Sequence, residues 1–314
     1  MTGRDGPLRM AAIGADLGGT KVAAVVLAED GRVGRGVRRA HDGTADGAVS
    51  TLIALLEELT ASSPPGALGI AAAGLVDRRR GVLVHSALLG IRDLPLAATL
   101  AARIGVDVRL ENDANATLEG IRATRADDGV TVLLTLGTGV GGAVSIGDRP
   151  IDGAFGFAAE LGHLPVEPPG LHACPCGSSG CLELVASGTA VARAARAAGL
   201  PGVDGRPPRA EDVVAAARAG DPTAAAVLDV AGTAIGTALA VLVPVLDPGT
   251  VYLAGGFGHA AAAHLIPAAE RRLRAQIPFP RSRPAPRILR DPVGPLAAAI
   301  GAARLAGRRT PTPL

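Results

Sequence analysis

The sequence is poor in several residue types. Its 314 residues include no Trp, one Tyr, three Cys and two Asn, and a single Lys stands among 31 basic Lys and Arg residues. An excess of charge of one sign is also lacking, since the formal net charge is only +2. This near balance argues against a polyanionic partner such as nucleic acid.

Long apolar runs are also lacking. No uninterrupted apolar run approaches the ~20 residues of a membrane-spanning helix. The N-terminal region leads into a short apolar stretch that is interrupted by Asp16, which is unlike a signal peptide. We therefore expect a cytoplasmic protein with no membrane partner. Its length exceeds that of one ordinary core and fits two packed α/β lobes.

The few positions that do carry rare residues are the places to search for chemistry. The only Lys is Lys21, and the only two Asn are Asn112 and Asn115. The three Cys fall within the eight residues 174–181. In a chain dominated by Ala, Arg, Gly and Pro, these positions are the first candidates for a functional site.

Hydrophobic patterning predicts two similar halves. Strands are expected near 10–16, 21–28 and 32–39, followed by a helix over 46–61 with Leu at helical spacing. A second set of strands, joined by another glycine-rich turn, begins at 130–136. This coarse internal repeat predicts an α/β fold with two lobes that face each other across a central cleft, the usual place for a ligand.

The segment from Asp16 to Lys21, Asp-Leu-Gly-Gly-Thr-Lys, lies between the first two expected strands. Gly18 and Gly19 allow the backbone to approach phosphate oxygens closely, and Thr20 and Lys21 add a hydroxyl and a positive charge. Asp16 is placed to hold Mg²⁺ through water. The alternative interpretation is a plain hairpin turn.

A second glycine loop supports the phosphate interpretation. Gly137, Thr138 and Gly139 open a loop over 137–142 that has the same form as the first. Neither loop matches a P-loop or a dinucleotide-binding turn, because both lie between two strands. A third turn, Gly255-Gly256, precedes a helix expected over 259–275 and is predicted to pack against the adenosine of a nucleotide.

Three polar residues lie where a strand expected over 106–111 gives way to a helix. Asn115 is expected to cap that helix. If the two glycine loops hold the phosphates of a phosphoryl donor, transfer needs a carboxylate beside the acceptor hydroxyl, and Asp113 is then the candidate catalytic base. The helix N-terminus would keep this carboxylate ionised.

The cysteine cluster predicts a structural zinc site. Three thiolates and one imidazole form a closed tetrahedral set, whereas three Cys cannot pair fully into disulfides, which the cytosol also disfavours. The sequence alone leaves His163 and His172 open as the fourth ligand. Two carboxylates flank the loop and are expected to bind sugar hydroxyls, with zinc orienting the loop. The residues of this region are Cys174, Cys176, Cys181, Glu160 and Glu183.

Together with Ala73–Asp77, these segments resemble the sugar kinases of the ROK family (repressors, open reading frames and kinases) along essentially the whole chain. The resemblance implies a two-lobe, actin-like (ribonuclease H-like) ATPase fold with ATP and sugar in the cleft. It divides the chain into an N-terminal lobe of residues 1–118 and 294–314 and a C-terminal lobe of residues 119–293.

The resemblance also implies roles for individual residues. Asp113 would be the base, and the backbone of Gly74 would lie near the sugar. The side chains that would bind the sugar are those of Asn112, Glu160, His163 and Glu183. His163 would bind zinc through its other ring nitrogen, together with Cys174, Cys176 and Cys181, which excludes His172.

The implied reaction is ATP-dependent phosphorylation of the 6-hydroxyl of a glucose-type hexose, with Mg²⁺ and structural Zn²⁺, by a homodimer or homotetramer. Only nine residues precede the first strand, too few for the DNA-binding region of the family's repressors. The zinc signature favours ATP over polyphosphate as the donor.

The chain departs from many relatives over Ser86–Arg92, where Leu88 and Ile91 replace an amide and an aromatic wall. A kinase for a modified or amino hexose, such as kanosamine or N-acetylglucosamine, is therefore an alternative. A non-catalytic sugar-sensing regulator is the alternative from another class.

Overall fold

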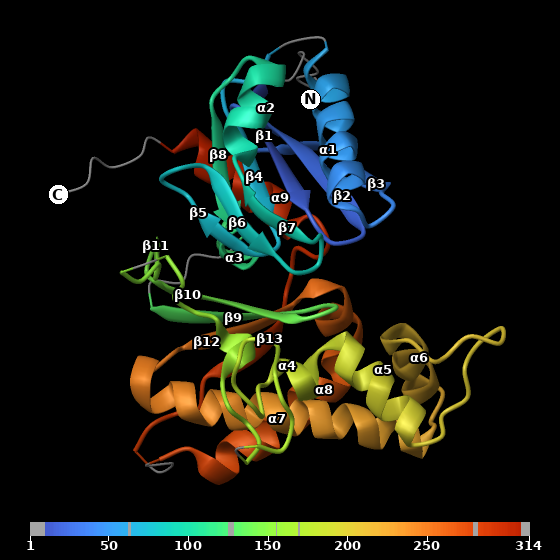
Figure 1. The fold of residues 1–314 in the computed structure, drawn as a ribbon. Coiled ribbons are helices and arrows are strands. Elements are labelled where there is room, and N and C mark those ends of the chain that lie inside the picture. Colours follow the sequence, from blue (N-terminus) through green and yellow to red (C-terminus); the bar gives the residue numbers. More distant parts are fainter. Residues whose placement is uncertain are drawn as a thin grey trace, which may run out of the picture. The chain divides into compact units, whose positions relative to one another are not determined.

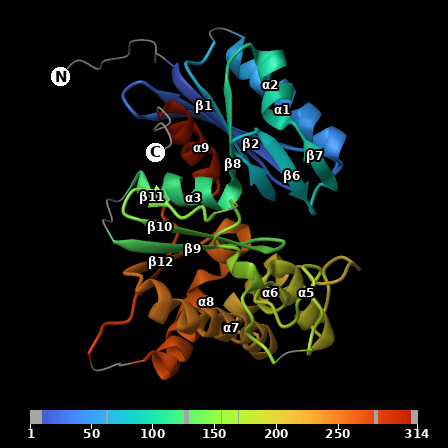
Figure 2. The ribbon, with the colours of Figure 1, turned by 60° about the vertical axis from the view of Figure 1, so that its left-hand side comes forward.

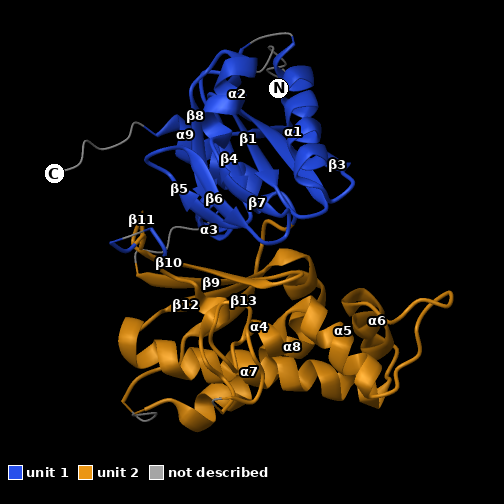
Figure 3. Ribbon diagram, in the orientation of Figure 1, with its two compact units in different colours: residues 1–126, 153–157, 295–314 blue, residues 127–152, 158–294 orange. Residues whose placement is uncertain are grey.

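The computed structural model describes residues 10–61, 64–124, 129–154, 156–168, 170–278 and 282–308. The chain forms two compact units, which Figure 1 shows as a ribbon and Figure 3 colours separately. Unit 1 contains residues 1–126, 153–157 and 295–314, and unit 2 contains residues 127–152 and 158–294. Unit 1 is thus completed by the C-terminal segment.

Unit 1 contains a five-stranded sheet in the order β3-β2-β1-β4-β8. The first three strands pair antiparallel, whereas β1, β4 and β8 are parallel. Apolar side chains on one face of the sheet pack against helices α1 and α2 in a common core. The elements are β1 (Met10–Leu17), β2 (Lys21–Ala28), β3 (Val33–Ala40), α1 (Ala45–Thr60), β4 (Leu68–Ala72), α2 (Leu96–Ile104) and β8 (Val108–Asn112).

Helices α3 (Asp113–Arg122) and α9 (Ala297–Gly307) belong to the opposite face of this sheet, and Figure 2 shows α9 beside it. Backbone meets backbone at this contact. A Cβ atom at Gly14 of β1 or Gly69 of β4 would overlap a carbonyl oxygen of α9, and one at Gly301 of α9 would overlap the carbonyl oxygen of Ala116 in α3. Side chains at these positions would hold α9 away from the sheet.

A buried carboxylate fastens the same two helices. Glu119 of α3 is only 6% exposed. Its Oε1 accepts hydrogen bonds from Arg304 at 3.3 Å and from Arg308 at 2.7 Å. Two guanidinium groups from the C-terminal segment therefore neutralise a charge that would be costly to bury alone.

A small antiparallel sheet also belongs to unit 1. Its strands are β5 (Leu75–Asp77), β6 (Val82–Ser86) and β7 (Ile91–Leu94). β5 and β7 have only three and four residues, too few to show a reliable hydrophobic period in the sequence.

Unit 2 repeats the sheet of unit 1 in the order β11-β10-β9-β12-β13, again with an antiparallel hairpin beside parallel strands. The strands are β9 (Val130–Leu136), β10 (Val140–Ile146), β11 (Arg149–Pro150), β12 (Thr250–Ala254) and β13 (Arg287–Arg290). The helical elements are η1 (Leu161–His163), α4 (Glu183–Ala186), α5 (Gly188–Ala197), α6 (Ala210–Arg218), α7 (Pro222–Leu246) and α8 (Gly255–Gln276).

Helix α7 corrects one expectation from the sequence. It is long and apolar enough to cross a membrane by length and composition alone. The expectation considered only uninterrupted apolar runs, whereas Gly and Thr residues break the run in α7 without adding charge. Its most apolar window is 61% buried within the structure. Leu228, Ile235 and Leu239 are fully buried in the core of unit 2. These features are typical of a core helix.

Replacing Gly301 by Ala should destabilise unit 1 strongly, because the new methyl group would overlap the backbone of α3. We expect a loss of about 1–3 kcal/mol or more, the range for overpacked cores. Gly307→Ala is the matched control, since it lies in the same helix and a Cβ there would meet no described atom within 4 Å. Urea midpoints for both variants test this. Equal midpoints would contradict the close-packing argument.

Candidate active site and metal centre

The first glycine loop, residues 18–20, joins β1 to β2. It forms hydrogen bonds with His41, the residue that directly follows β3. The Gly18 N–H donates to the carbonyl of Lys21 at 3.1 Å, and the His41 N–H donates to the carbonyl of Thr20 at 3.2 Å. The His41 ring lies with Nε2 2.9 Å from the Gly18 carbonyl, and its Nδ1 accepts from the Gly43 N–H at 3.1 Å. Only the neutral ring with its proton on Nε2 satisfies both partners. His41 therefore supports this loop, a role that the sequence analysis missed.

Asp16 is the last-but-one residue of β1, and its pKa is raised to about 7. Burial is the largest cause, and the negative charge of Asp113 adds to it, while Arg38 and Lys21 act in the opposite direction. The two acids that the sequence singled out in unit 1 therefore interact electrostatically. A bound cation would relieve both burial and repulsion, so this pair fits a Mg²⁺-dependent site.

Asp113 lies at the N-terminus of α3, as expected, and is its first residue, because Asn112 rather than Asn115 caps the helix. The Asn112 Oδ1 accepts from the N–H groups of Ala114 at 2.9 Å and Asn115 at 3.2 Å. Its Nδ2 donates to the Gly74 carbonyl at 3.0 Å, which brings together two residues of the predicted sugar site. The expectation for Asn115 was wrong because the helix begins earlier than the capping pattern suggested.

Glu111, the residue directly before the cap residue Asn112, is a buried acid. Glu111 is 2% exposed, and its Oε2 accepts from Arg78 at 3.1 Å. Its Oε1 accepts from the Asn112 N–H at 3.1 Å and from the Asn115 Nδ2 at 3.3 Å. This network fixes the backbone that presents Asp113.

The second glycine loop is held by the segment that follows the cysteines. The Gly188 N–H donates to the Gly137 carbonyl and the Thr189 hydroxyl donates to the Thr138 carbonyl, both at 2.8 Å. The Glu183 Oε2 accepts from the Val140 N–H at 2.8 Å. Strand β10 begins at Val140, so the loop is shorter than the predicted range 137–142.

Gly255 and Gly256 are the first two residues of α8, so this helix begins four residues earlier than predicted. Gly255 has a φ of +81°, and a Cβ there would lie 2.5 Å from the carbonyl oxygen of Leu136, the last residue of β9. The first N–H groups of a helix have no partner within it and favour anions. In unit 2 this helix start therefore lies against the strand that leads into the second glycine loop.

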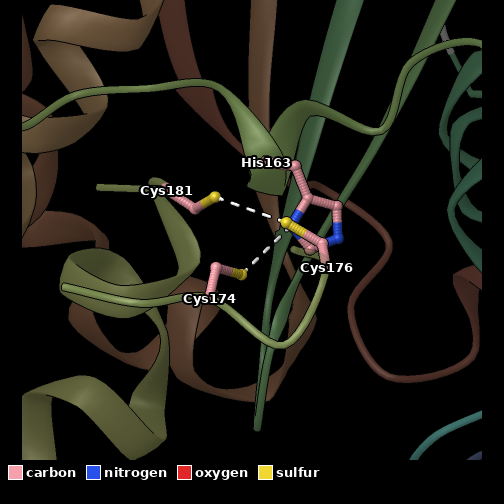
Figure 4. Close-up of side chains that lie close together, drawn as sticks. All are labelled: His163, Cys174, Cys176 and Cys181. Atoms are coloured by element: carbon pink, nitrogen blue, oxygen red, sulfur yellow. Dashed lines mark hydrogen bonds between the residues drawn. The ribbon is translucent and has the colours of Figure 1, made fainter. Parts of the chain in front are cut away.

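The three thiols and His163 converge, as Figure 4 shows. Their ligand atoms all lie within 4.8 Å of one another. The Cys174 Sγ lies 3.7 Å from the His163 Nδ1, and the Cys176 Sγ lies 3.7 Å from the Cys181 Sγ. In contrast, His172 is not a member of this set, and its Nδ1 lies 2.8 Å from the Glu167 Oε2.

Two acids lie beside this cluster in the same unit. Glu160 directly precedes η1, which carries His163. Burial raises the pKa of Glu160, His163 lowers it and Glu183 raises it further. The interaction of Glu160 with both groups places all three predicted sugar-binding side chains of unit 2 in one neighbourhood.

A family model described as the ROK family matches residues 12–309. The chain belongs to the ROK family. It is 34% identical to a glucokinase of Streptomyces coelicolor over 96% of this chain and 98% of that protein. An N-acetylmannosamine kinase of Yersinia pestis is 32% identical over 77% of this chain and 82% of that protein.

Among solved structures, a ROK family glucokinase from Streptomyces griseus in complex with glucose and AMPPNP superposes with a TM-score of 0.84 at 34% identity. The match covers 94% of this chain and 98% of that one. The predicted α/β, actin-like ATPase fold is therefore confirmed for this ROK protein.

The two departures from the ROK pattern differ in position. Leu88 is 46% exposed. It lies against Gly19, since a Cβ atom added to Gly19 would be 3.1 Å from the Leu88 Cβ. Ile91 is only 4% exposed and belongs to the core of unit 1, so it offers little surface to a ligand. Leu88 thus presents an apolar surface beside the first glycine loop.

Replacing Asp16 by Asn should stabilise the ligand-free ROK protein at pH 8. The folded pKa of about 7 lies above the ordinary value of 3.8, so the folded state binds this proton more tightly than the unfolded chain. The resulting stability is fully present below pH 3.8 and is lost as the pH rises through 7.

We therefore expect Asp16→Asn to raise the melting temperature by several degrees at pH 8 and by clearly less at pH 5. Asp30→Asn is the control, because that exposed carboxylate has a lowered pKa through hydrogen bonds from Arg32. Thermal melts without Mg²⁺ and nucleotide test the expectation. A shift of the same size at both pH values would contradict the raised pKa.

Proposed function

We propose that this ROK protein is a glucokinase that transfers the terminal phosphate of ATP to the 6-hydroxyl of glucose. The observation that carries the proposal is the electrostatic interaction, within unit 1, of the candidate base Asp113 with Asp16, the acid that precedes the first glycine loop. The glucokinase relatives, which match over nearly the full length, supply the sugar.

Each part of the chain has a defined task in this reaction. Asp113 orients the acceptor hydroxyl and receives its proton, and the dipole of α3 attracts the negative charge of this carboxylate. The two glycine loops and Lys21 bind the phosphates, and the Gly255-Gly256 helix start packs against the adenosine. Asp16 would hold Mg²⁺ through water, and the bound cation would neutralise part of the phosphate charge.

The sugar contacts are assigned to both units. In unit 1, Asn112 and the backbone of Gly74 are already joined by a hydrogen bond, which sets the direction of the Asn112 amide. In unit 2, Glu160 interacts with both His163 and Glu183. Carboxylate and imidazole groups suit sugar hydroxyls, because they accept or donate hydrogen bonds in fixed directions.

We assign a structural Zn²⁺ to His163, Cys174, Cys176 and Cys181. A tetrahedral zinc with bonds of about 2.3 Å separates its sulfur ligands by about 3.8 Å, close to the 3.7 Å between Cys176 and Cys181. Burial and the neighbouring thiols raise the pKa of Cys181 to about 12, so without a metal it stays protonated. The Nδ1 of His163 faces Cys174, which leaves Nε2 for a sugar hydroxyl.

The alternatives have less support. The amino-hexose kinase hypothesis depends on the departure at Leu88 alone, whereas the Streptomyces relatives that match nearly the full length are glucokinases. A non-catalytic sensor would not need Asp113, Lys21 and two glycine loops together. The cytoplasm is the proposed location, because it supplies ATP and keeps the cysteines reduced. A homodimer or homotetramer is proposed from the family resemblance.

Coupled ADP release with MgATP tests the proposed function against glucose, N-acetylglucosamine, mannose, N-acetylmannosamine and kanosamine. We expect strong turnover of glucose. Replacing Asp113 by Asn should lower kcat by about 10²–10⁴-fold, the usual contribution of a general base, while glucose binding is retained. Stronger turnover of another sugar in the panel would replace glucose as the substrate. Unchanged turnover in Asp113→Asn would overturn its role as base.

Metal analysis of the purified chain tests the zinc assignment. We expect about one zinc per chain, because the four ligands form one closed site. Cys174→Ser should lose most of the zinc and unfold at lower temperature. His172→Ala is the matched control, since it lies in the same loop but faces Glu167, and it should keep its zinc. Loss of zinc in His172→Ala with retention in Cys174→Ser would reverse the assignment.

A further inference from the structure

Arg38 of β3 lies in register with Asp16 across the sheet of unit 1. Asp16 pairs with Ala23 of β2, and Ala23 pairs with Arg38. Residues directly opposite one another on paired strands share a face of the sheet. Arg38 and Asp16 therefore lie on the same face, two strands apart, with only the methyl group of Ala23 between them.

This face leads to the first glycine loop. Ala40, the last residue of β3, pairs with Lys21, and His41 directly afterwards holds the loop. Strands alternate their side chains, so Lys21 and Arg38 fall on the same face as Asp16. The end of this sheet therefore carries two cations and one acid beside the Gly18-Gly19 backbone.

The Arg38 side chain is exposed, and it forms no hydrogen bond or ion pair with any residue that the structure describes. Its neighbours on the strand differ. Arg35 and Arg39 fall on the opposite face, where both contact Glu58 of α1. Arg38 alone of these three is left without a carboxylate partner, although its charge is felt at Asp16.

We propose that Arg38 binds the outer phosphates of ATP at the first glycine loop. The inference rests on the proposed function, since it assumes a nucleotide polyphosphate at that loop. A planar guanidinium matches two phosphate oxygens at once, which a lysine cannot do. Lys21 and Arg38 then approach the phosphates from neighbouring strands, and Asp16 is the residue that would hold the metal.

Calorimetric titration of the full chain tests the proposal with three probes, namely a non-hydrolysable ATP analogue, ADP and AMP, each with Mg²⁺. Arg38→Ala should weaken binding of the ATP analogue about 10- to 100-fold, the range for a hydrogen bond to a charged group. Binding of AMP, which lacks the outer phosphates, should not change. Arg38→Lys should give an intermediate loss of affinity, because lysine keeps the positive charge but lacks the planar guanidinium that binds two phosphate oxygens at once.

Arg35→Ala is the matched control, because it removes an exposed arginine of the same strand on the opposite face. It should bind all three probes like the unchanged chain. The proposal is overturned if Arg38→Ala binds the ATP analogue normally, or if it loses AMP to the same extent. A chain that shows the expected Arg38 pattern but does not phosphorylate glucose would support this proposal while rejecting the proposed function.

Discussion

The backbone contact of α9 with the sheet and with α3 is the constraint on which the rest of unit 1 depends. Carbonyl groups of α9 occupy the space where side chains of Gly14, Gly69 and Gly120 would lie. β1 ends near Asp16 and α3 begins with Asp113, so this packing sets where both acids stand. The C-terminal segment therefore acts on the site without contributing any of the predicted site residues.

The two glycine loops also depend on contacts with neighbouring elements. Each unit has an antiparallel hairpin beside parallel strands, and each hairpin turn is a glycine loop. Neither loop is held by its own residues alone. His41, directly after β3, forms hydrogen bonds with the first loop. Gly188 and Thr189, the first residues of α5, form hydrogen bonds with the second loop. Glycine makes the close approach possible, and the neighbouring element fixes the direction of the backbone.

Local patterns were enough to predict much of this structure. The bounds of β2 and β9 agree with the sequence pattern, because hydrophobic period and turn residues act over a few positions. The start of α8 was misplaced, since glycines have low helix propensity and a contact with Leu136 decides their conformation. Arg38 was missed because its relation to Asp16 depends on strand register, which hydrophobic periodicity does not give.

The raised pKa of Asp16 shows how stability and binding oppose each other at this site. Burial and the charge of Asp113 disfavour its ionised form, whereas a metal ligand must be ionised. Lys21 and Arg38 offset part of this cost from the same face of the sheet, although neither neutralises it. The ligand-free unit 1 is therefore strained at the point where a cation would bind. Metal and nucleotide would then gain affinity by relieving a repulsion that the fold itself maintains.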